Sequence, residues 1–425
     1  MFLRNTIWSF GAQVVRLITA LLLIALLDPA ARGFQSLLVL LPTLLTLLAL
    51  LGVSSATPVL LQRGVAADRL MRNLLGLGLL VLAALVLALP PLAPAIARFL
   101  SGEYRVTPGD VLVGLLLLPP LLLGEYLRAI LLALRDLRQV ALTQCATALA
   151  QLLAALALVG GLRLGPRGAL WAMVLGAWIG FGWTLRAVWR IGPPLPRLER
   201  AVLRPLLSLG LRGHVGNVVQ TFNYRLDALL VQGFLGQAAV GLYQTGVLLA
   251  ELLWYLPNAV SAALLPQIAA TGDRTLTPRA TRQTVLLTGL GALGLLIVAW
   301  PALRWLRPAY LGAFTPLAVL LVGVVALSIH KVLAGDLSGR GLPQYPSLTS
   351  SVALVVTVGL DLLLIPRLGI VGAALASTLA YTTQTVILLW CYRRVSGVSW
   401  RALLVPRRAD LAFYRRLVRR REAGV

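Results

Sequence analysis

The chain of 425 residues is too apolar to cover the surface of a water-soluble protein of its length. Hydrophobic residues make up 59% of it and charged residues only 12%, with a mean hydropathy of +0.88, whereas a soluble domain carries roughly 25% charged residues. The formal net charge of +24 is of the size seen in nucleic-acid-binding proteins. Here, however, the arginines punctuate apolar stretches instead of clustering in one segment, which argues against that class.

Apolar stretches of about twenty residues, the length that crosses ~30 Å of hydrocarbon, recur along the whole chain. We predict an all-α membrane protein of about twelve transmembrane helices. The second span and two later ones exceed the thickness of a bilayer, so we expect them to tilt, to bend at Pro42 or Pro257, or to run past the interface. The predicted spans are 6–27, 34–61, 74–92, 111–134, 141–160, 168–189, 206–235, 240–268, 284–306, 311–333, 347–365 and 371–391.

The charges between the spans test this topology. With twelve spans, 28 lysines and arginines fall on the side that holds both termini, and eight fall on the other side. This bias follows the positive-inside rule and predicts that both termini are cytoplasmic. Two more, Arg16 and Arg225, lie well inside spans. The minority of eight comprises Arg32, Arg98, Arg105, Arg163, Arg167, Arg304, Arg307 and Arg367.

The two ends of the chain and its cysteines add three expectations. Residues 395–425 form a basic tail with interleaved apolar residues, which we expect to lie on the anionic cytoplasmic leaflet; a solvated, disordered tail is the alternative. The first span is not interpreted as a cleavable signal peptide, because its apolar stretch is long and no small-residue cleavage site is obvious. Cys145 and Cys391 fall within spans and indicate neither a disulfide nor a metal site.

An internal repeat divides the chain into two halves. Six helices per half is an even number, so the halves share one orientation and should be related by an axis along the membrane normal. Two such lobes can enclose a central cavity that opens to each side in turn. We predict an N-lobe at residues 1–203, a C-lobe at 204–394 and the tail at 395–425. The matches pair Leu27, Ala30, Ala31, Gly33 and Pro58 with Leu235, Ala238, Ala239, Gly241 and Pro266 (offset 208), Arg135, Leu137 and Gln139 with Arg340, Leu342 and Gln344 (205), and residues 163–165 and 168–169 with 367–369 and 372–373 (204).

Several stretches of the second half carry a family resemblance: YRLDALL at 224–230, AVGLY at 239–243, LP at 256–257, LLP at 264–266 and LIPRLGIVGAA at 364–374. They resemble the bacterial polysaccharide-biosynthesis (Wzx-type) oligosaccharide flippases of the multidrug/oligosaccharidyl-lipid/polysaccharide exporter superfamily. The resemblance implies a MATE-like fold in the cell (inner) membrane and transport of a polyprenyl-diphosphate-linked oligosaccharide to the outer leaflet. It implies a lipid-linked oligosaccharide and membrane lipids as partners, and it raises glycan polymerase or ligase machinery as a further partner.

Polar residues inside the spans suggest where a substrate binds. An arginine in mid-membrane costs about 2.5–3.5 kcal/mol on insertion scales, so it faces a cavity or a partner. Arg16 and Arg225 lie at matching depths in the first helix of each half, and guanidinium offers paired donors to phosphate oxygens. We expect them to hold the diphosphate; for each arginine the alternative is a structural role, in which it pairs with an acid or caps backbone carbonyls at a contact between the lobes. The candidate substrate-binding residues are Arg16, Arg225, Gln13, Asn217, Gln220 and Tyr224.

Four acids inside the spans are candidates for gating or for coupling to an ion. A carboxyl group in a low dielectric can take up a proton near neutral pH, so transport could be coupled to H+ or Na+ although no cofactor is expected. The alternative for each acid is a structural pair. The four are Asp227, Glu251, Glu125 and Asp361.

Three other functions stay open. A cation-coupled multidrug exporter would favour an acidic or aromatic cavity, whereas the two clearest mid-span charges are arginines. A lipid II flippase resembles a fourteen-helix plan. A membrane enzyme needs carboxylates or histidine on a sizeable loop, and the longest polar gaps, residues 99–109 and 191–204, hold no paired carboxylates and no metal-ligand constellation. We therefore predict a non-enzymatic flippase that works by alternating access.

Overall fold

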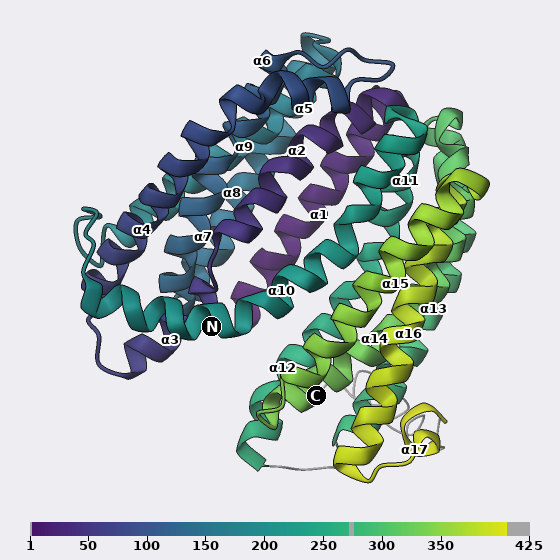
Figure 1. Cartoon of the computed structure of the whole chain (residues 1–425). Helices are drawn as coiled ribbons and strands as arrows, with labels where there is room; N and C mark the ends of the chain where they lie inside the picture. The colour runs from purple at the N-terminus through teal and green to yellow at the C-terminus, as the bar shows by residue number, and fades with distance from the viewer. Residues whose placement is uncertain (1, 272–275, 406–425) are drawn as a thin grey trace, which may run out of the picture. The chain divides into compact units, whose positions relative to one another are not determined.

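The structure, a computed structural model, describes residues 2–271 and 276–405, and every regular element in these ranges is a helix (Figure 1). Within these ranges, 11 helical segments are long and apolar enough to cross a membrane. The predicted span at 206–235 is not among them. It lies in α10 (Arg200–Leu235), a single helix of 36 residues that carries more polar side chains than the others. The prediction of an all-α, multi-pass membrane protein is confirmed.

The first half of the chain folds into helices that polar caps help to start. The Asp28 carboxylate accepts a hydrogen bond from the Ala31 amide at the start of α2, and Asp136 does the same for Gln139 at the start of α8. Such caps satisfy amides that have no partner in the first turn. The helices are α1 (Phe2–Leu26), α2 (Pro29–Ala49), α3 (Val53–Gln62), α4 (Ala67–Ala88), α5 (Ala93–Leu100), α6 (Pro108–Leu115), α7 (Leu118–Ala133), α8 (Leu137–Ala155) and α9 (Gly165–Val188).

The second half consists of the long helix α10 and a further set of spans. A short 3-10 turn at Leu252–Trp254 interrupts the predicted span 240–268, just before Pro257. The helices after α10 are α11 (Gln237–Glu251), α12 (Tyr255–Thr271), α13 (Leu276–Leu306), α14 (Phe314–Gly339), α15 (Gln344–Leu368), α16 (Ile370–Ser396) and the short α17 (Trp400–Leu404).

The interruption of the second span is not at Pro42, one of the two bend positions expected from the sequence. Helix α2 continues through Pro42, and the break lies between α2 and α3, where Leu51 and Gly52 have φ angles of 49° and 73°. A Cβ on Gly52 would collide with the backbone of Gly210 in α10. Glycine is required here both for its positive φ and for the close passage of α10. The bend is therefore set by packing, which the local sequence does not show.

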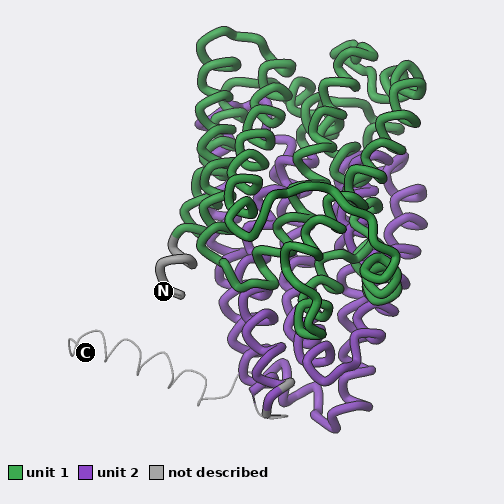
Figure 2. The backbone as a smooth tube through the Cα atoms, turned by 90° about the vertical axis from the view of Figure 1, so that its left-hand side faces the viewer, with its two compact units in different colours: residues 1–218, 231–242 green, residues 219–230, 243–425 purple. Residues whose placement is uncertain are grey.

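The chain forms two compact units (Figure 2). Unit 1 comprises Met1–Val218 and Val231–Leu242, and unit 2 comprises Val219–Leu230 and Tyr243–Val425. Helices α10 and α11 therefore each contribute to both units. The predicted lobes, residues 1–203 and 204–394, were defined by matches between the two halves of the sequence and not by compactness. Their boundary stays a prediction.

Each unit has its own apolar core. In unit 1, Tyr126 is fully buried and its hydroxyl donates to the Ala49 carbonyl at 2.7 Å. In unit 2, Leu403 of α17 is fully buried in a cluster with Leu333 and Tyr392, so the first residues of the predicted tail pack against the spans. The rest of that tail, residues 406–425, lies outside the described residues.

The close passage at Gly52 gives a first prediction. Both Gly52 and Gly64 have positive φ, but a Cβ on Gly64 would meet nothing within 4 Å. Gly64→Ala should therefore lose only the ~1–2 kcal/mol of left-handed strain, while Gly52→Ala should lose more, because its methyl group overlaps a backbone. Thermal melting of the two variants in detergent measures the difference. Equal melting temperatures would show that α10 yields at no cost.

Candidate substrate site

Unit 1 contains a cavity of about 380 Å³ between α1, α2, α7, α8 and α9. Its wall combines two arginines and one acid with neutral hydrogen-bonding side chains. Apolar residues such as Val39, Met173 and Phe181 complete the lining. The polar lining residues are Arg16, Thr43, Glu125, Arg128, Thr143, Gln144, Thr147, Gln151 and Thr184.

Positive charges outnumber negative charges in the lining of this cavity. Arg128 and Glu125 sit one turn apart on α7 and pair in a bidentate manner, with Nε–Oε1 at 2.9 Å and Nη2–Oε2 at 2.5 Å. This pair neutralises the acid. The Arg16 guanidinium donates to the Gln13 side chain of its own helix at 3.4 Å. Two guanidinium groups and one carboxylate leave the lining with a net positive charge, so the cavity suits an anionic group.

Helix α8 supplies most of the neutral polar lining because it packs its polar face against glycines of α9. Gly176 and Gly180 are four residues apart, and a Cβ on either would collide with the side chain of Gln151 or Thr147. Small residues at this spacing let two membrane helices approach closely. The hydroxyl of Thr143 also lies 3.3 Å from that of Thr184. Amides and hydroxyls held in this way can donate hydrogen bonds to phosphate oxygens, and can donate to or accept from the hydroxyl groups of sugars.

In unit 2, Arg225 forms an ion pair inside the span region. Its Nη2 donates to Oε2 of Glu251 at 3.2 Å, and Nη1 lies 3.1 Å from Oε1. Both side chains are less than one third exposed. The structure therefore gives Arg225 an acidic partner, the second of the two roles that the sequence left open, and the partner is one of the four acids singled out for gating or ion coupling.

Next to this pair, an aromatic group holds a lysine. The rings of Tyr224, Trp254 and Tyr381 have centroid separations of 4.6 to 6.4 Å. The ammonium group of Lys331 lies 4.6 Å from the Trp254 ring centroid and donates to the Asn258 side chain at 3.0 Å. Aromatic faces attract cations in this geometry. Tyr224, predicted to bind substrate, thus packs against two aromatic rings and a cation.

Three other predicted polar residues of α10 have different surroundings. Gln220 accepts a hydrogen bond from the Ser350 hydroxyl of α15. Asp227 is buried, accepts from the Tyr243 hydroxyl at 2.5 Å, and lies 3.5 Å from the Ser377 hydroxyl. Asn217, by contrast, is exposed. The stripe predicted along this helix is therefore divided between packing contacts in unit 2 and an exposed position.

Asp361 of α15 differs from the other acids. It is fully buried, and neither carboxyl oxygen has a hydrogen-bond partner among the described residues. Its neighbourhood in unit 2 is polar: Asp227 lies within electrostatic range, and Thr357, one turn earlier, donates to Asn223 at 2.6 Å. An ionised carboxylate without a partner is very unfavourable at such a position, so Asp361 needs a proton or a cation. In the described ranges, no group of three or more His, Cys, Asp or Glu residues is placed to hold a metal ion.

Three sets of site residues were not predicted from the sequence: Arg128, the polar face of α8, and Lys331. The span boundaries place Arg128 with the cytoplasmic loop charges, although its one-turn spacing from Glu125 is a usable signal. The polar face of α8 follows helical spacing at 143, 144, 147 and 151, and this stripe is visible in the sequence. Lys331 gives no such pattern, because its partners come from α10 and α12 and from the turn before α12.

The fold is that of known membrane transporters. One similar structure is "Lipid II flippase MurJ, inward closed conformation". The alignment covers 92% of this chain and 87% of the MurJ chain, with a TM-score of 0.75 and 16% sequence identity. An inward-facing multidrug resistance MATE family transporter of the MOP superfamily covers 91% and 94%, with a TM-score of 0.72 at 14% identity. The protein is therefore a multi-pass membrane protein whose fold is of the class found in these two structures.

Within this class the sequence identifies the family. The chain belongs to the polysaccharide biosynthesis protein family, whose profile matches residues 22–291, more than half of it. The probable low-salt glycan biosynthesis flippase Agl15 of Haloferax volcanii is 21% identical to this chain, over 51% of this chain and 47% of the relative. The putative O-antigen transporter of Shigella flexneri is 23% identical, over 43% of this chain and 46% of the relative. The chain thus matches about half the length of these relatives.

The ion pair in unit 2 gives a prediction about stability. Arg225→Gln and Glu251→Gln should each destabilise the protein, because each leaves a half-buried charge without its partner. The double variant should be more stable than the sum of the single effects implies, with a coupling of about 1–2 kcal/mol. Thermal melting in detergent of the wild type, the two single variants and the double variant forms a double-mutant cycle that measures this coupling energy.

The ion pair of Arg69 with Glu199, at 2.5 Å but with Arg69 49% exposed, is the matched control. Its coupling should be smaller, because water screens it. Additive effects in the Arg225 cycle would show that the pair contributes nothing and would return Arg225 to the set of candidate substrate ligands.

Proposed function

We propose that this protein is a flippase that moves a polyprenyl-diphosphate-linked oligosaccharide from the cytoplasmic to the outer leaflet. The observation that carries the proposal is the positively charged cavity of unit 1, lined by Arg16, by the Arg128–Glu125 pair and by the polar face of α8. The names of the relatives, which are those of a glycan flippase and an O-antigen transporter, support it. The two halves, 1–203 and 204–394, would alternate access with both termini in the cytoplasm.

In this mechanism the diphosphate meets the guanidinium group of Arg16, and the sugars meet amides and hydroxyls of α8. The polyprenyl tail stays in the lipid, since transferring a long hydrocarbon chain into a polar cavity is unfavourable. The multidrug-exporter alternative would require a site for organic cations. The one acid among the described residues of the unit 1 lining is already paired with Arg128, which disfavours a multidrug exporter. Membrane lipids and glycan polymerase or ligase machinery are the partners that this function implies.

Ion coupling is proposed at Asp361. Its two oxygens without a hydrogen-bond partner among the described residues, the carboxylate of Asp227 within electrostatic range and the hydroxyl of Thr357 one turn earlier on α15 are oxygen groups of the kind that a proton or Na+ needs. Glu251 and Glu125 are less suited to this role, because Arg225 and Arg128 already pair with them.

The diphosphate site predicts the effect of removing Arg16. In proteoliposomes, Arg16→Ala should slow translocation of a polyprenyl-diphosphate sugar about 10- to 100-fold, as expected for a charge-assisted hydrogen bond of ~1.5–3 kcal/mol. Arg16→Lys should have an intermediate rate, since an ammonium group keeps the charge but loses the paired donors. Arg63→Ala, at an exposed position at the end of α3, is the control and should match the wild type.

Unchanged translocation by Arg16→Ala, at equal protein abundance, would assign Arg16 to a structural role and leave the flippase standing. Absence of diphosphate-lipid movement by the wild-type protein, together with efflux of organic cations, would overturn the proposed function in favour of the multidrug exporter.

The proposed ion site at Asp361 predicts how translocation responds to an ion gradient. If Asp361 carries the coupled ion, Asp361→Asn should abolish the acceleration of translocation by an imposed H+ or Na+ gradient while leaving the slow, gradient-independent exchange. Asp68→Asn, in the first turn of α4 and not among the cavity-lining residues, should keep the gradient response and serves as the control. The measurement is the initial rate with and without each gradient; a full gradient response in Asp361→Asn would exclude this residue as the coupling site.

A further inference from the structure

Helices α2 and α11 begin at equivalent positions of the two repeats. Pro29 opens α2 and Gln237 opens α11, 208 residues later, and Gly33 and Gly241 are separated by the same 208. A Cβ added to Gly33 would collide with the carbonyl of Gln237, and a Cβ added to Gly241 would collide with the carbonyl of Pro29. Each glycine therefore touches the residue that opens the other helix, which is the reciprocity of a two-fold relation. We call these four residues, all in unit 1, the glycine joint.

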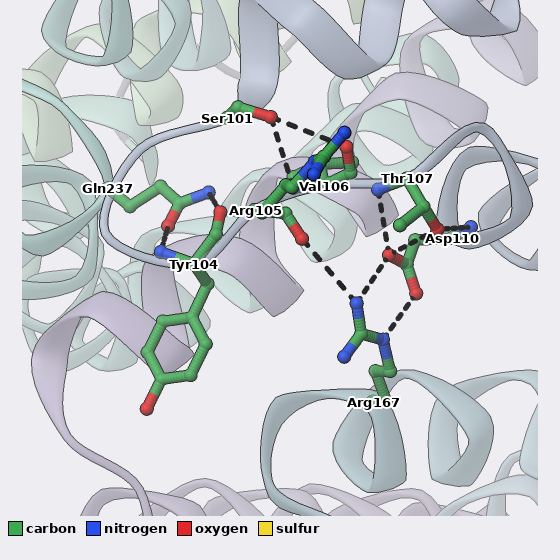
Figure 3. Close-up of polar contacts among 8 residues, drawn as sticks. All are labelled: Ser101, Tyr104, Arg105, Val106, Thr107, Asp110, Arg167 and Gln237. Atoms are coloured by element: carbon green, nitrogen blue, oxygen red, sulfur yellow. Dashed lines mark hydrogen bonds and ion pairs between the residues drawn. The ribbon is translucent and has the colours of Figure 1, made fainter.

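The loop between α5 and α6 fastens this joint by hydrogen bonds (Figure 3). Gln237 is fully buried; its Nε2 donates to the carbonyls of Leu100 at 2.7 Å and Tyr104 at 2.9 Å, and its Oε1 accepts from the Tyr104 amide at 2.9 Å. Gln232 also donates to the Leu100 carbonyl, at 3.2 Å. The Tyr104 hydroxyl donates to the Asp28 carboxylate just before α2, at 2.8 Å. One loop residue thus ties the starts of both helices together.

The chain enters and leaves the glycine joint through unit 2. Residues 219–230 and those from 243 onward belong to unit 2, whereas 231–242 between them belong to unit 1. Helix α10 is unbroken at residue 230 and α11 is unbroken at residue 242. A sharp kink in a helix needs a proline or a comparable defect, and no proline occurs between residues 219 and 251. A movement of unit 2 would therefore pull on the joint instead of bending these helices.

We propose that the glycine joint is a releasable seal on the membrane face opposite the N-terminus, closed in this structure and parted during each transport cycle. This proposal rests on the alternating access proposed above and adds which groups close the far side. Glycine–carbonyl contacts and amide hydrogen bonds can be replaced by water, so parting them exposes little large apolar surface. Segment 231–242 would leave the loop at residues 99–104 as one piece, carried by α10 and α11.

A disulfide tests the seal directly. A Cβ at position 102 would lie 3.1 Å from Cγ of Gln237, the atom that a cysteine sulfur replaces, so Gly102→Cys with Gln237→Cys should cross-link with little backbone movement. The background carries Cys145→Ala and Cys391→Ala. Thr147→Cys in the unit 1 cavity is the reporter, labelled by a membrane-impermeant maleimide added to the outside of intact cells. Gly102→Cys without its partner is the control.

The seal predicts that the cross-linked protein is labelled at position 147 at least tenfold more slowly than the same protein after reduction, while the single-cysteine control is insensitive to the reductant. Labelling that continues at full rate in the cross-linked protein would overturn the proposal, because the cavity would open outward with the joint closed. Absence of outside labelling in both forms would overturn it as well. The readout does not depend on the substrate, so a failed lipid-translocation assay remains distinguishable from a failed seal.

A second pair of variants tests the glycines without a cross-link. Gly33→Ala and Gly241→Ala should each raise outside labelling of Thr147→Cys several-fold, because the added methyl group forces the helix starts apart. Gly182→Ala on α9, where a Cβ meets nothing within 4 Å, should leave labelling unchanged. If Gly33→Ala and Gly241→Ala are produced at normal abundance and label like the wild type, the joint is not the seal.

Discussion

A polar or charged group inside an apolar helix must find a partner in the protein, because the surrounding lipid offers none. Much of what distinguishes this chain from a simple helical bundle follows from that constraint. Glu125 is met by Arg128, Arg225 by Glu251, and Asp227 by the hydroxyl of Tyr243. Among the four acids singled out from the sequence, Asp361 is the exception, since both of its oxygens lack a hydrogen-bond partner among the described residues. An exception to so strict a rule is where an ion is to be sought.

The same constraint separates the two units chemically. In unit 1, Arg16 lines the cavity together with the Arg128–Glu125 pair. In unit 2, Arg225 is bound by Glu251 of the next helix, and Lys331 is held against the faces of Trp254 and Tyr224. The two arginines that the sequence analysis compared therefore have different surroundings. A lipid with an anionic head group would meet two cationic regions of different character, one lined by amides and hydroxyls and the other by aromatic rings.

Close approach of helices is the second recurrent device. Gly52 meets Gly210, the α9 glycines meet the polar face of α8, and the glycine joint brings α2 to α11. In each case the missing side chain lets a backbone or a polar side chain come within contact distance. The contacts differ in what they position: the break between α2 and α3, the wall of the unit 1 cavity, or the starts of α2 and α11. Glycine content alone could not tell these apart.

The sequence by itself determined the class of protein, the number of spans to within one segment and the family, because hydropathy, loop charge and repeated motifs are properties of consecutive residues. It also singled out Arg16 and Glu125, which the structure places in the lining of the unit 1 cavity, since a polar side chain inside an apolar stretch is visible locally. Only the tertiary structure decided that Arg225 belongs to Glu251, that Asp361 lacks a partner among the described residues and that the break in the second span lies at Gly52. Those outcomes depend on which side chain a neighbouring helix presents at a given depth, and packing across more than a hundred residues of chain, as between Gly52 and Gly210, leaves no mark in the local pattern.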